Sequence, residues 1–467
     1  MSALQKTLFS QHKSAHLLDR ATSHARHYLL TADSLPAFPS NESLNKLDCF
    51  NDSLPEEIGD AQQIIELLAK TGGENTVHYS GGRYYGFVNG GALPIGTAAR
   101  IIADVWDQNA ALYVMSPIAA KLEDVVQAWL CQLFNVPTGT VAGLVGGTSV
   151  ASLCGLAAAR YRQLSKLNWN VSEKGLFGAP NLRVVMGKQT HGTVIKMLSL
   201  LGFGQQHIEW IDCDEQGRLL VGELPKLDHS CIVVLQAGNV CSGAFDDFRQ
   251  ILPLAKKAGA WVHVDGAFGL WAAASKAFSH LTDSVELADS WSVDGHKTLN
   301  TPYDCGIILC ADQQALTHAL HQQGSYIQSS DARDSMIYTP DMSRRAKGIE
   351  LWACLKFLGK KGISDLVELL HQHACYFAAS ATKSGFEVLN DVVFNQVMLS
   401  CENDEITQET LKQIQGSGVC WCGEASWNGR AIIRISICSW ATTQEDIDIS
   451  ISEFVRARDD ATYVINQ

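Results

Sequence analysis

The sequence predicts an α/β protein with a large domain built on a mainly parallel β-sheet, followed by a smaller C-terminal α/β domain. Within residues 182–310, short apolar runs alternate with helix-like segments such as TVIKMLSLL and FRQILPLAKKA. The strand-like runs are LRVVMG, HIEWID, CIVVLQ, WVHVD, DSWSVD and GIILC. They are apolar almost throughout, which is typical of strands covered on both faces. Strands that alternate with helices along the chain favour a parallel sheet with helices packed on it.

Residues 1–115 are expected to form an N-terminal arm and a loop-rich segment. Residues 1–30 mix polar and apolar side chains and lack the apolar centre of a secretion signal, which predicts an amphipathic helical arm. The later stretch YSGGRYYGFVNGGALP, at Tyr79–Pro94, combines glycines with aromatic residues. Such a stretch suits neither helix nor strand, so we expect an ordered loop near a site or an interface.

Residues 116–370 are assigned to the large domain, which opens with a predicted helix over SPIAAKLEDVVQAWLCQLFNVP. Ser116 is placed to cap this helix, and Pro117 occupies its first position. Apolar residues then repeat at helical spacing, as at Leu122, Val126 and Leu130. The alternating strand-like and helix-like runs follow.

Residues 371–467 are assigned to a small C-terminal domain. Two strand-like runs, NQVMLSC and RAIIRISIC, flank the helix-like segment ITQETLKQIQGSG, and a final helix is expected from Thr442. A unit of about 100 residues is within the usual size range of a domain.

Composition narrows the class of protein. The chain has 467 residues, 46% hydrophobic and 18% charged, the balance of a compact globular enzyme. A net charge of -13 argues against nucleic acid as a partner, and no stretch approaches the roughly 20 apolar residues of a membrane-spanning helix. The 14 cysteines lack metal-ligand spacing except for C-W-C at Cys420–Cys422, which favours free thiols over a zinc site or disulfides. We therefore expect a cytoplasmic enzyme that binds a small molecule.

Several reactive residues follow strand-like runs. His191 follows LRVVMGKQT, Asp265 ends WVHVD, and His296 with Lys297 follows DSWSVD. In open parallel sheets, ligands bind beyond the carboxyl ends of the strands. Taken singly, Asp265 could be a structural cap, and His191 could be a core histidine bonded to a carbonyl.

A glycine turn, VGGTS, opens a helix-like segment at the start of the same region. Backbone N–H groups at a helix start, helped by small hydroxyls, can bind a phosphate group. The turn Gly146–Ser149 is neither a Walker loop nor a dinucleotide fingerprint, and alone it could be an ordinary helix cap.

Together with Lys297, the glycine turn, His191 and Asp265 can be explained by one bound cofactor. A lysine removed from water has a lowered pKa and can form a Schiff base with an aldehyde. The chain therefore carries the parts needed to hold pyridoxal 5'-phosphate: Thr148 and Ser149 for the phosphate, Lys297 for the aldehyde, and Asp265 to keep the pyridine nitrogen protonated. The residues predicted in this way to contact the cofactor are Gly147, Thr148, Ser149, His191, Asp265, Ala267 and Lys297. His191 could stack on one ring face, with the small Ala267 allowing close approach on the other.

The segments WVHVDGAFG and ADSWSVDGHKTLNTPYDCG resemble the pyridoxal-phosphate-dependent group II amino-acid decarboxylases, which are glutamate- and aromatic-amino-acid-decarboxylase-like enzymes. The resemblance extends from GRYYGFVNGG to WNGRAIIRISICSWATTQEDID. It implies fold type I of these enzymes and a homodimer with active sites at the subunit interface. It also implies Lys297 as the Schiff-base lysine, Asp265 as the pyridine partner, His191 as the stacking residue, and His296 with Ser149 as phosphate contacts.

Two segments depart from the family pattern. QAGNVCSGAFDD has Asn239 and Val240 where the family usually has two threonines. The turn of Gly147, Thr148, Ser149 and Val150 replaces a usual glycine-glycine-serine-glutamate. These departures concern the phosphate contacts and the substrate rather than the identity of the cofactor.

The resemblance implies decarboxylation of an L-amino acid to its amine. In the family a tyrosine on a loop commonly helps to protonate the carbanion, and the matching region is SYIQSSDARDSMIYTPDMSRRAKG. Tyr338 is the candidate, with Tyr326 as the alternative, and a tyrosine that only packs at an interface is an equal reading. Arg344 and Arg345 could bind a carboxylate or form structural ion pairs.

The substrate pocket is expected to include Phe87, Asn89 and Asn109, because their segments resemble family segments that line it. Arg434 alternates within RAIIRISIC and could lie on a solvated sheet face. The alternative activities are a carbon–carbon lyase or an aminotransferase of the same fold, and a different class is a catalytically silent cofactor-binding protein. Carbon dioxide release without a keto acid would single out the decarboxylase.

Overall fold

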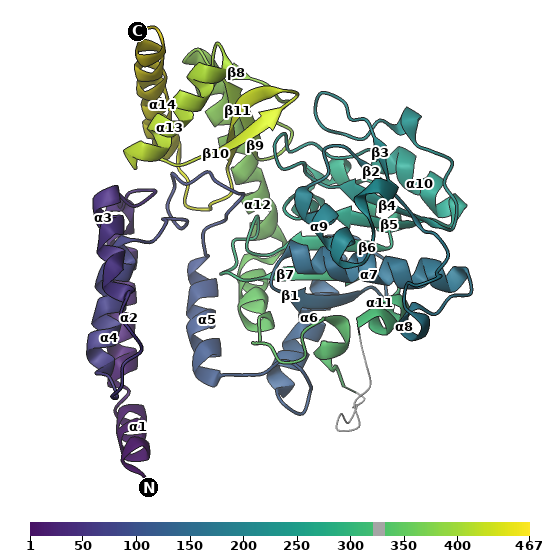
Figure 1. Cartoon of the computed structure of the whole chain (residues 1–467). Helices are drawn as coiled ribbons and strands as arrows, with labels where there is room; N and C mark the ends of the chain where they lie inside the picture. Colours follow the sequence, from purple (N-terminus) through teal and green to yellow (C-terminus); the bar gives the residue numbers. More distant parts are fainter. Residues whose placement is uncertain (321–331) are drawn as a thin grey trace.

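The computed structural model describes residues 1–320 and 332–467, and its centre is a seven-stranded sheet (Figure 1). The strand order is β1-β7-β6-β5-β4-β2-β3. The strands are β1 (Val141–Val145), β2 (Arg183–Gly187), β3 (Ile208–Ile211), β4 (Cys231–Gln236), β5 (Trp261–Asp265), β6 (Ser290–Asp294) and β7 (Gly306–Cys310). Strand β7 is antiparallel to both of its neighbours, and the other pairs are parallel. The predicted mainly parallel sheet is confirmed.

Two layers of helices cover this sheet. One core joins the sheet to α7 (Thr148–Lys166), α9 (Gly192–Leu200) and α11 (Gln313–Leu320). The core on the other face joins it to α6 (Pro117–Leu133), α10 (Phe248–Ala258) and α12 (Gly348–Lys383). Because both faces are covered, β1, β4, β5, β6 and β7 are buried along their whole length. A short helix, α8 (Val171–Lys174), follows α7.

The predicted helix start at Ser116 is confirmed. The Ser116 hydroxyl accepts a hydrogen bond from Ala119 N at 3.3 Å, and Pro117 is the first residue of α6. A proline is tolerated there because the first N–H groups of a helix have no intrahelical acceptor.

The small domain contains a four-stranded antiparallel sheet of order β10-β11-β9-β8. Its elements are β8 (Glu387–Val388), β9 (Gln396–Ser400), α13 (Asp404–Ser417), β10 (Gly423–Trp427), β11 (Arg430–Ser436) and α14 (Gln444–Ile465). Helix α12 belongs to both domains, since Leu351 and Leu355 pack in the large core and Ala374 and Phe377 in the small one. The boundary expected near residue 370 lies within this helix.

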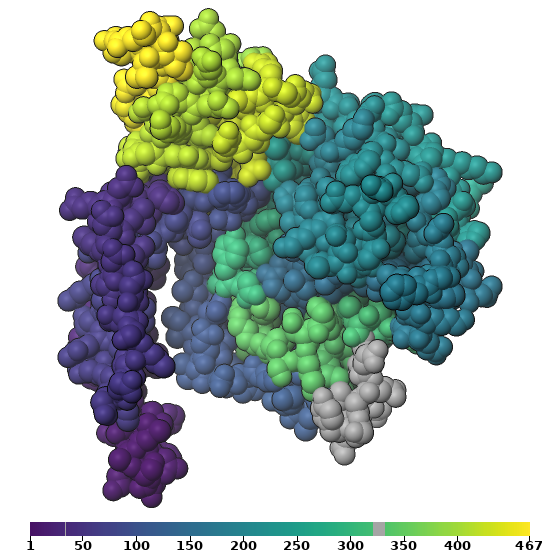
Figure 2. Space-filling view, viewed as in Figure 1, coloured from purple at the N-terminus to yellow at the C-terminus, as the bar shows by residue number. Residues whose placement is uncertain are grey.

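The N-terminal region carries α1 (Ala3–Ser14), α2 (His16–Thr31), α3 (Asn41–Asn45), α4 (Ala61–Leu67) and α5 (Pro94–Trp106). Helices α1 to α4 form an arm beside the body of the molecule, drawn in purple in Figure 2. They contain no buried residue. The connection between α2 and α3 meets the small domain, where Ala37 N donates to Gly418 O at 2.9 Å. In the described parts of the chain, no helix is long and apolar enough to cross a bilayer.

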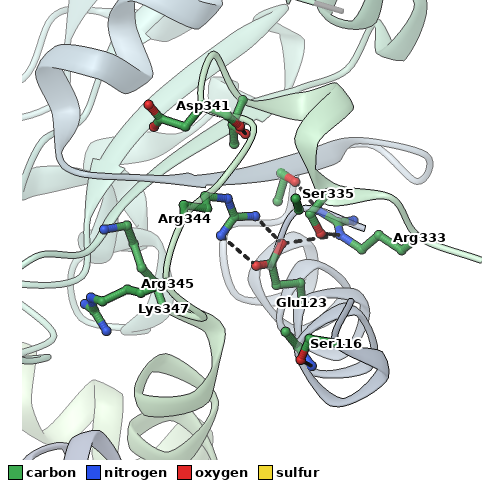
Figure 3. Close-up of polar contacts among 12 residues, drawn as sticks. Ser116, Glu123, Arg333, Ser335, Asp341, Arg344, Arg345 and Lys347 are labelled. Carbon is green, nitrogen blue, oxygen red and sulfur yellow. Dashed lines mark hydrogen bonds and ion pairs between the residues drawn. The ribbon is translucent and has the colours of Figure 1, made fainter. Parts of the chain in front are cut away.

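A buried ion cluster ties α6 to the segment before α12 (Figure 3). The Glu123 side chain is 1% exposed, and Arg333 and Arg344 beside it are each 4% exposed. Arg344 Nη2 donates to Glu123 Oε2 at 2.9 Å, and its Nη1 lies 2.9 Å from Oε1. Burial alone would raise the pKa of Glu123, but the guanidinium groups outweigh it and hold this pKa below its usual range. The cluster therefore stabilises the fold through a carboxylate that stays charged.

Replacing Glu123 with glutamine is expected to destabilise the protein by about 3–5 kcal/mol, because it leaves two buried guanidinium groups without a counter-charge. Urea unfolding of the cofactor-loaded protein measures the change. Asp124→Asn is the matched control, since Asp124 is 50% exposed and lies 3.5 Å from Arg333. An exposed pair contributes only about 0–1 kcal/mol, so equal losses in the two variants would contradict this account.

The difference between the wild type and Glu123→Gln should also depend on pH. Folding lowers the pKa of Glu123, so its contribution is complete above the unfolded value of about 4.3 and is lost as pH falls through the lower folded value. The difference should therefore shrink below about pH 4.

Candidate functional site

The candidate site lies where the parallel strands β4, β5 and β6 end together. Gln236 pairs with Asp265 across β4 and β5, and Asp265 pairs with Ser292 across β5 and β6. After Asp294 the chain makes the turn that carries Lys297 and then returns as β7. Helix α7 begins at the same edge, since it follows β1 directly.

The carboxylate of Asp294 joins the lysine turn to the start of α7. Asp294 Oδ2 lies 3.1 Å from Lys297 Nζ and 3.6 Å from His296 Nε2. Its Oδ1 accepts a hydrogen bond from Thr148 N at 2.7 Å. His296 is held from its other side, where Nδ1 accepts from Cys305 N at 3.1 Å. Asp294 was not predicted as a site residue, although an acid three residues before the lysine in the sequence was a usable signal.

Asn300 links the lysine turn to the small domain. Asn300 is buried, has a left-handed backbone (φ 58°), and donates through Nδ2 to the carbonyl oxygens of Lys297 at 3.0 Å and Cys438 at 2.9 Å. Its Oδ1 accepts from Trp440 N at 2.8 Å. Gly90 packs on the same turn so closely that a β-carbon there would overlap Lys297 O. The N-terminal loop and the small domain thus both reach Lys297.

Asp265 and His191 influence each other within this group. Burial raises the pKa of Asp265, while the positive charges of His191 and Lys297 act in the opposite direction. Desolvation lowers the pKa of His191, against the opposing effect of Asp265. His191 Nδ1 accepts from Thr193 N at 3.3 Å and lies 2.7 Å from Thr193 Oγ1, so the neutral ring carries its proton on Nε2.

The glycine turn has the features of an anion site. Thr148 is the first residue of α7, and in the described structure its buried Oγ1 has no hydrogen-bond partner. Ser149 follows it in the first helical turn, where the backbone N–H groups have no intrahelical acceptor and point past the N-terminus of the helix. Gly147 lies beside His296, whose Cε1 would be 3.5 Å from a β-carbon there. Ala267 is close by, donating its backbone N–H to Asp265 Oδ1 at 3.3 Å.

Arg434 faces this site from strand β11 of the small domain and is not on a solvated face. Its guanidinium lies 6.0 Å from the centroid of the Phe87 ring and acts on the pKa values of His191 and Cys241. Its Nε is buried and lacks a hydrogen-bond partner in the described structure. Sequence alternation placed Arg434 correctly on a strand but could not show which face meets the large domain.

The N-terminal loop adds an aromatic wall. Phe87 is 58% exposed and stacks on Trp421 of the small domain, with ring centroids 5.3 Å apart. Asn89 Oδ1 accepts from the Tyr303 hydroxyl at 2.6 Å, and the Tyr303 ring lies 4.3 Å from that of His296. Asn89 is therefore connected to the lysine turn through Tyr303, and Phe87 lies near Arg434. That the two residues line a substrate pocket stays a prediction. Trp421 was missed because no local pattern links it to this site. Tyr303 was also missed, although it lies in the same segment as Lys297, GHKTLNTPYDCG.

Other predicted residues lie elsewhere. Asn109 accepts from Ala111 N at 3.1 Å and donates to Ser343 Oγ at 3.1 Å, so it fixes a chain crossing. Arg344 is paired with Glu123, so its guanidinium is used in a structural ion pair.

Arg345 is also engaged in ion pairs rather than facing the lysine. It contacts Glu350 and lies 3.2 Å from Asp304 Oδ1. Arg344 and Arg345 both form ion pairs within the fold, which was one of the two interpretations given for them.

Tyr338 does not join the lysine group within this chain. It is 9% exposed, its ring lies 4.8 Å from the Arg333 guanidinium, and its hydroxyl accepts from Gln313 Nε2 at 3.2 Å. Packing under Arg333 accounts for these contacts, which suits the reading of Tyr338 as a packing residue. The alternative, Tyr326, lies outside the described residues.

Comparison with known proteins identifies the family. The pyridoxal-dependent decarboxylase conserved domain matches residues 43–401. Similar proteins include an aromatic-L-amino-acid decarboxylase of Bacillus atrophaeus, 25% identical over 428 residues that cover 86% of both chains. A cysteine sulfinic acid decarboxylase of Rattus norvegicus is 25% identical over 372 residues, covering 73% of this chain and 74% of the relative.

Solved structures show the same fold. The Oryza sativa TDC structure with PLP and tryptamine superposes with a TM-score of 0.88 at 22% identity, covering 97% of this chain and 98% of that one. The structure of mouse CSAD gives 0.87 at 20% identity, covering 95% and 98%. With the family domain matched over most of its length, the chain belongs to the pyridoxal-dependent decarboxylases, a family of carboxy-lyases, and its cofactor is pyridoxal 5'-phosphate.

Proposed function

We propose that this protein decarboxylates an L-amino acid to the corresponding amine, with Lys297 as the residue that bonds to the cofactor. The observation that carries this proposal is the meeting of Lys297, Asp265, His191 and Thr148 at one edge of the sheet. Family membership supports the reaction class. The named relatives act on aromatic amino acids or on cysteine sulfinate, so family membership does not fix the side chain of the substrate.

The residues present fit the cofactor. The partnerless Thr148 Oγ1, the first turn of α7 with Ser149, and nearby His296 suit its phosphate. Among residues 1–320 and 332–467, no cationic side chain lies within 4 Å of the buried Asp265 carboxylate, which suits a protonated ring nitrogen as partner. When bound, the cofactor supplies an electron sink for the bond that breaks at the α-carbon.

The side chains of this chain then have separate tasks. With the cofactor bound, Asp265 would hold a proton at the ring nitrogen, and a neutral His191 would add no positive charge beside the ring. Asp294 orients Lys297 Nζ, which would bond to the cofactor and would also be placed to carry a proton. Arg434, which has a buried Nε without a partner, is placed to bind the substrate carboxylate.

A homodimer is the proposed assembly. Helices α1 to α4 bury no residue of their own, yet Leu8, Phe9 and Leu29 on them are more than half exposed. The surface beyond α5 is also apolar, with Val114 77% exposed. A second copy that covers these surfaces would remove them from water.

The free cysteines support a cytoplasmic location.

Lys297→Ala is expected to abolish the absorption band that lysine-bound cofactor gives near the visible edge, and to abolish carbon dioxide release. Purified protein supplied with pyridoxal phosphate is scanned first and then assayed against a panel of L-amino acids for carbon dioxide and amine. Lys188→Ala is the control, because Lys188 is an exposed lysine that pairs with Asp212. The proposal would be contradicted if Lys297→Ala kept the band as Lys188→Ala does. It would also be contradicted if the product were a keto acid or an aldehyde in place of the amine.

Arg434→Met is expected to lower kcat/KM for the accepted amino acid by about 10- to 100-fold, because a charge-assisted hydrogen bond is worth about 1.5–3 kcal/mol. Its cofactor spectrum should persist. Arg430→Met is the matched control on the same strand, since Arg430 is exposed and pairs with Glu387 at 2.6 Å. Equal kinetic effects in the two variants would rule out a carboxylate contact at Arg434.

A further inference from the structure

The segment that departs from the family pattern forms a loop of residues 238–243 directly after β4. Strand β4 ends at Gln236, which pairs with Asp265, so the loop begins at the sheet edge that carries the proposed active site. Asn239, at a position where the family usually has a threonine, is only 1% exposed. A buried amide needs hydrogen-bond partners, and those of Asn239 come from two segments.

The Asn239 side chain holds its own loop and connects it to the turn before His191. Its Oδ1 accepts hydrogen bonds from Cys241 N at 2.9 Å and from Ser242 N at 3.2 Å, which closes the loop as a tight turn. Its Nδ2 donates to Gln189 O at 3.3 Å. Because Gln189 lies two residues before His191, Asn239 ties the loop to the segment that carries the proposed stacking residue.

A hairpin covers Asn239 and reaches the small domain. It is formed by residues 213–219, which a bridge between the first and last of them closes. A β-carbon at Gly217 in this hairpin would lie 3.1 Å from Asn239 Nδ2 and 2.8 Å from the Trp427 ring. Trp427, the last residue of β10, donates through Nε1 to Glu215 O at 3.1 Å. Asn239 therefore lies at the contact between the large and the small domain.

The same loop packs on the face of the small sheet that carries Arg434. Cys241 belongs to one buried cluster with Met398 and Ile432. Met398 is directly opposite Arg434 in the register of β9 and β11, and Ile432 is two residues before Arg434 on β11. Residues that are directly opposite, or two apart along a strand, point to the same face of a sheet. Arg434 therefore projects from the face that Cys241 contacts.

The Arg434 guanidinium is a neighbour of the Cys241 thiol. Burial raises the pKa of Cys241, and the nearby charge of Arg434 acts in the opposite direction. On the other side of β11, Gly423 is directly opposite Arg434, and a β-carbon there would lie 3.7 Å from Arg434 Nη2. A shift of the loop would therefore move a group against which the Arg434 side chain lies.

We propose that Asn239 is a positioning residue for the proposed reaction, because it holds residues 238–243 between the turn before His191 and the small sheet and so sets the place of Arg434. The inference rests on the proposed function, in which Arg434 binds the substrate carboxylate. It gives the departure from the family pattern at Asn239 a role in substrate affinity. The single hydroxyl of a threonine could not occupy the positions of both Oδ1 and Nδ2.

A double-mutant cycle of Asn239→Ala and Arg434→Met in the cofactor-loaded protein tests this role. Asn239→Ala is expected to raise KM for the accepted amino acid about tenfold and to change kcat less than about twofold, because a displaced Arg434 loses uniform binding. In the Arg434→Met background it should change kcat/KM less than about twofold, since the group that it positions is gone. Asn239→Thr should recover part of the loss, and the cofactor spectrum should persist throughout.

Gln163→Ala is the matched control. Gln163 is also a buried amide with two hydrogen bonds, to Cys231 O at 3.0 Å and to Gly259 O at 3.1 Å. It contacts the start of β4 rather than the loop after its end. Gln163→Ala should lower stability in urea unfolding and leave KM unchanged, so an equal rise of KM in both variants would overturn the proposal.

Thiol labelling with N-ethylmaleimide, followed by peptide mass mapping, gives a readout that does not require activity. Cys241 is 8% exposed and should be labelled at least about fivefold faster in Asn239→Ala than in the wild type, because its loop opens locally. The exposed Cys375 should be labelled alike in both, and the buried Cys310, which reports general unfolding, should stay unlabelled. If Asn239→Ala does not fold, Asn239→Thr takes its place in the cycle and in the labelling.

Three further results would overturn the proposal while the proposed function stands. They are unchanged labelling of Cys241, labelling of Cys241 and Cys310 together, and an equal loss of kcat/KM from Asn239→Ala in both backgrounds. Failure of the proposed function would be seen separately, as no amine product or as no effect of Arg434→Met on kcat/KM. Either of these would remove the basis of the inference about Asn239 as well.

Discussion

The buried carboxylate of Asp294 is the group on which the geometry of the site depends. A carboxylate that is only 3% exposed must be paired or hydrogen-bonded, and Asp294 meets this need with Lys297 Nζ and Thr148 N. These two partners, Lys297 in the lysine turn and Thr148 at the start of α7, are 149 positions apart in the sequence. The same carboxylate thus fixes Lys297 and the glycine turn at the start of α7 relative to each other.

The site is assembled from three regions of the sequence, and each contributes a different kind of chemistry. The large domain supplies Lys297, Asp265, Asp294 and the glycine turn proposed for the phosphate, because its parallel strands end together at one edge. The N-terminal loop supplies Phe87, and the small domain supplies Trp421 and Arg434. Asn300 connects the lysine turn to the small domain through Cys438 O and Trp440 N. The proposed cofactor contacts are therefore local to one domain, whereas the proposed substrate contacts depend on how the regions pack.

This division explains what could be predicted from the sequence. The parallel sheet, the cap at Ser116 and the grouping of Asp265 with Lys297 follow from local patterns and from the rule that parallel strands end at one edge. The pair of Glu123 and Arg344 joins residues 221 positions apart, and no local pattern links them. Strand β10 was also missed, because GEASW is short and its middle residues are not buried. Side-chain partners over long range come from packing, which a single sequence does not display.

The central claim is that Lys297 carries the cofactor, and chemical trapping tests it most directly. Borohydride reduction of the cofactor-loaded protein fixes the cofactor to its lysine, and peptide mass mapping then locates the modified residue. The account predicts one modified peptide, with the added mass on Lys297 in the segment after β6. Modification of a different lysine, or of none in protein that shows the cofactor band, would contradict it.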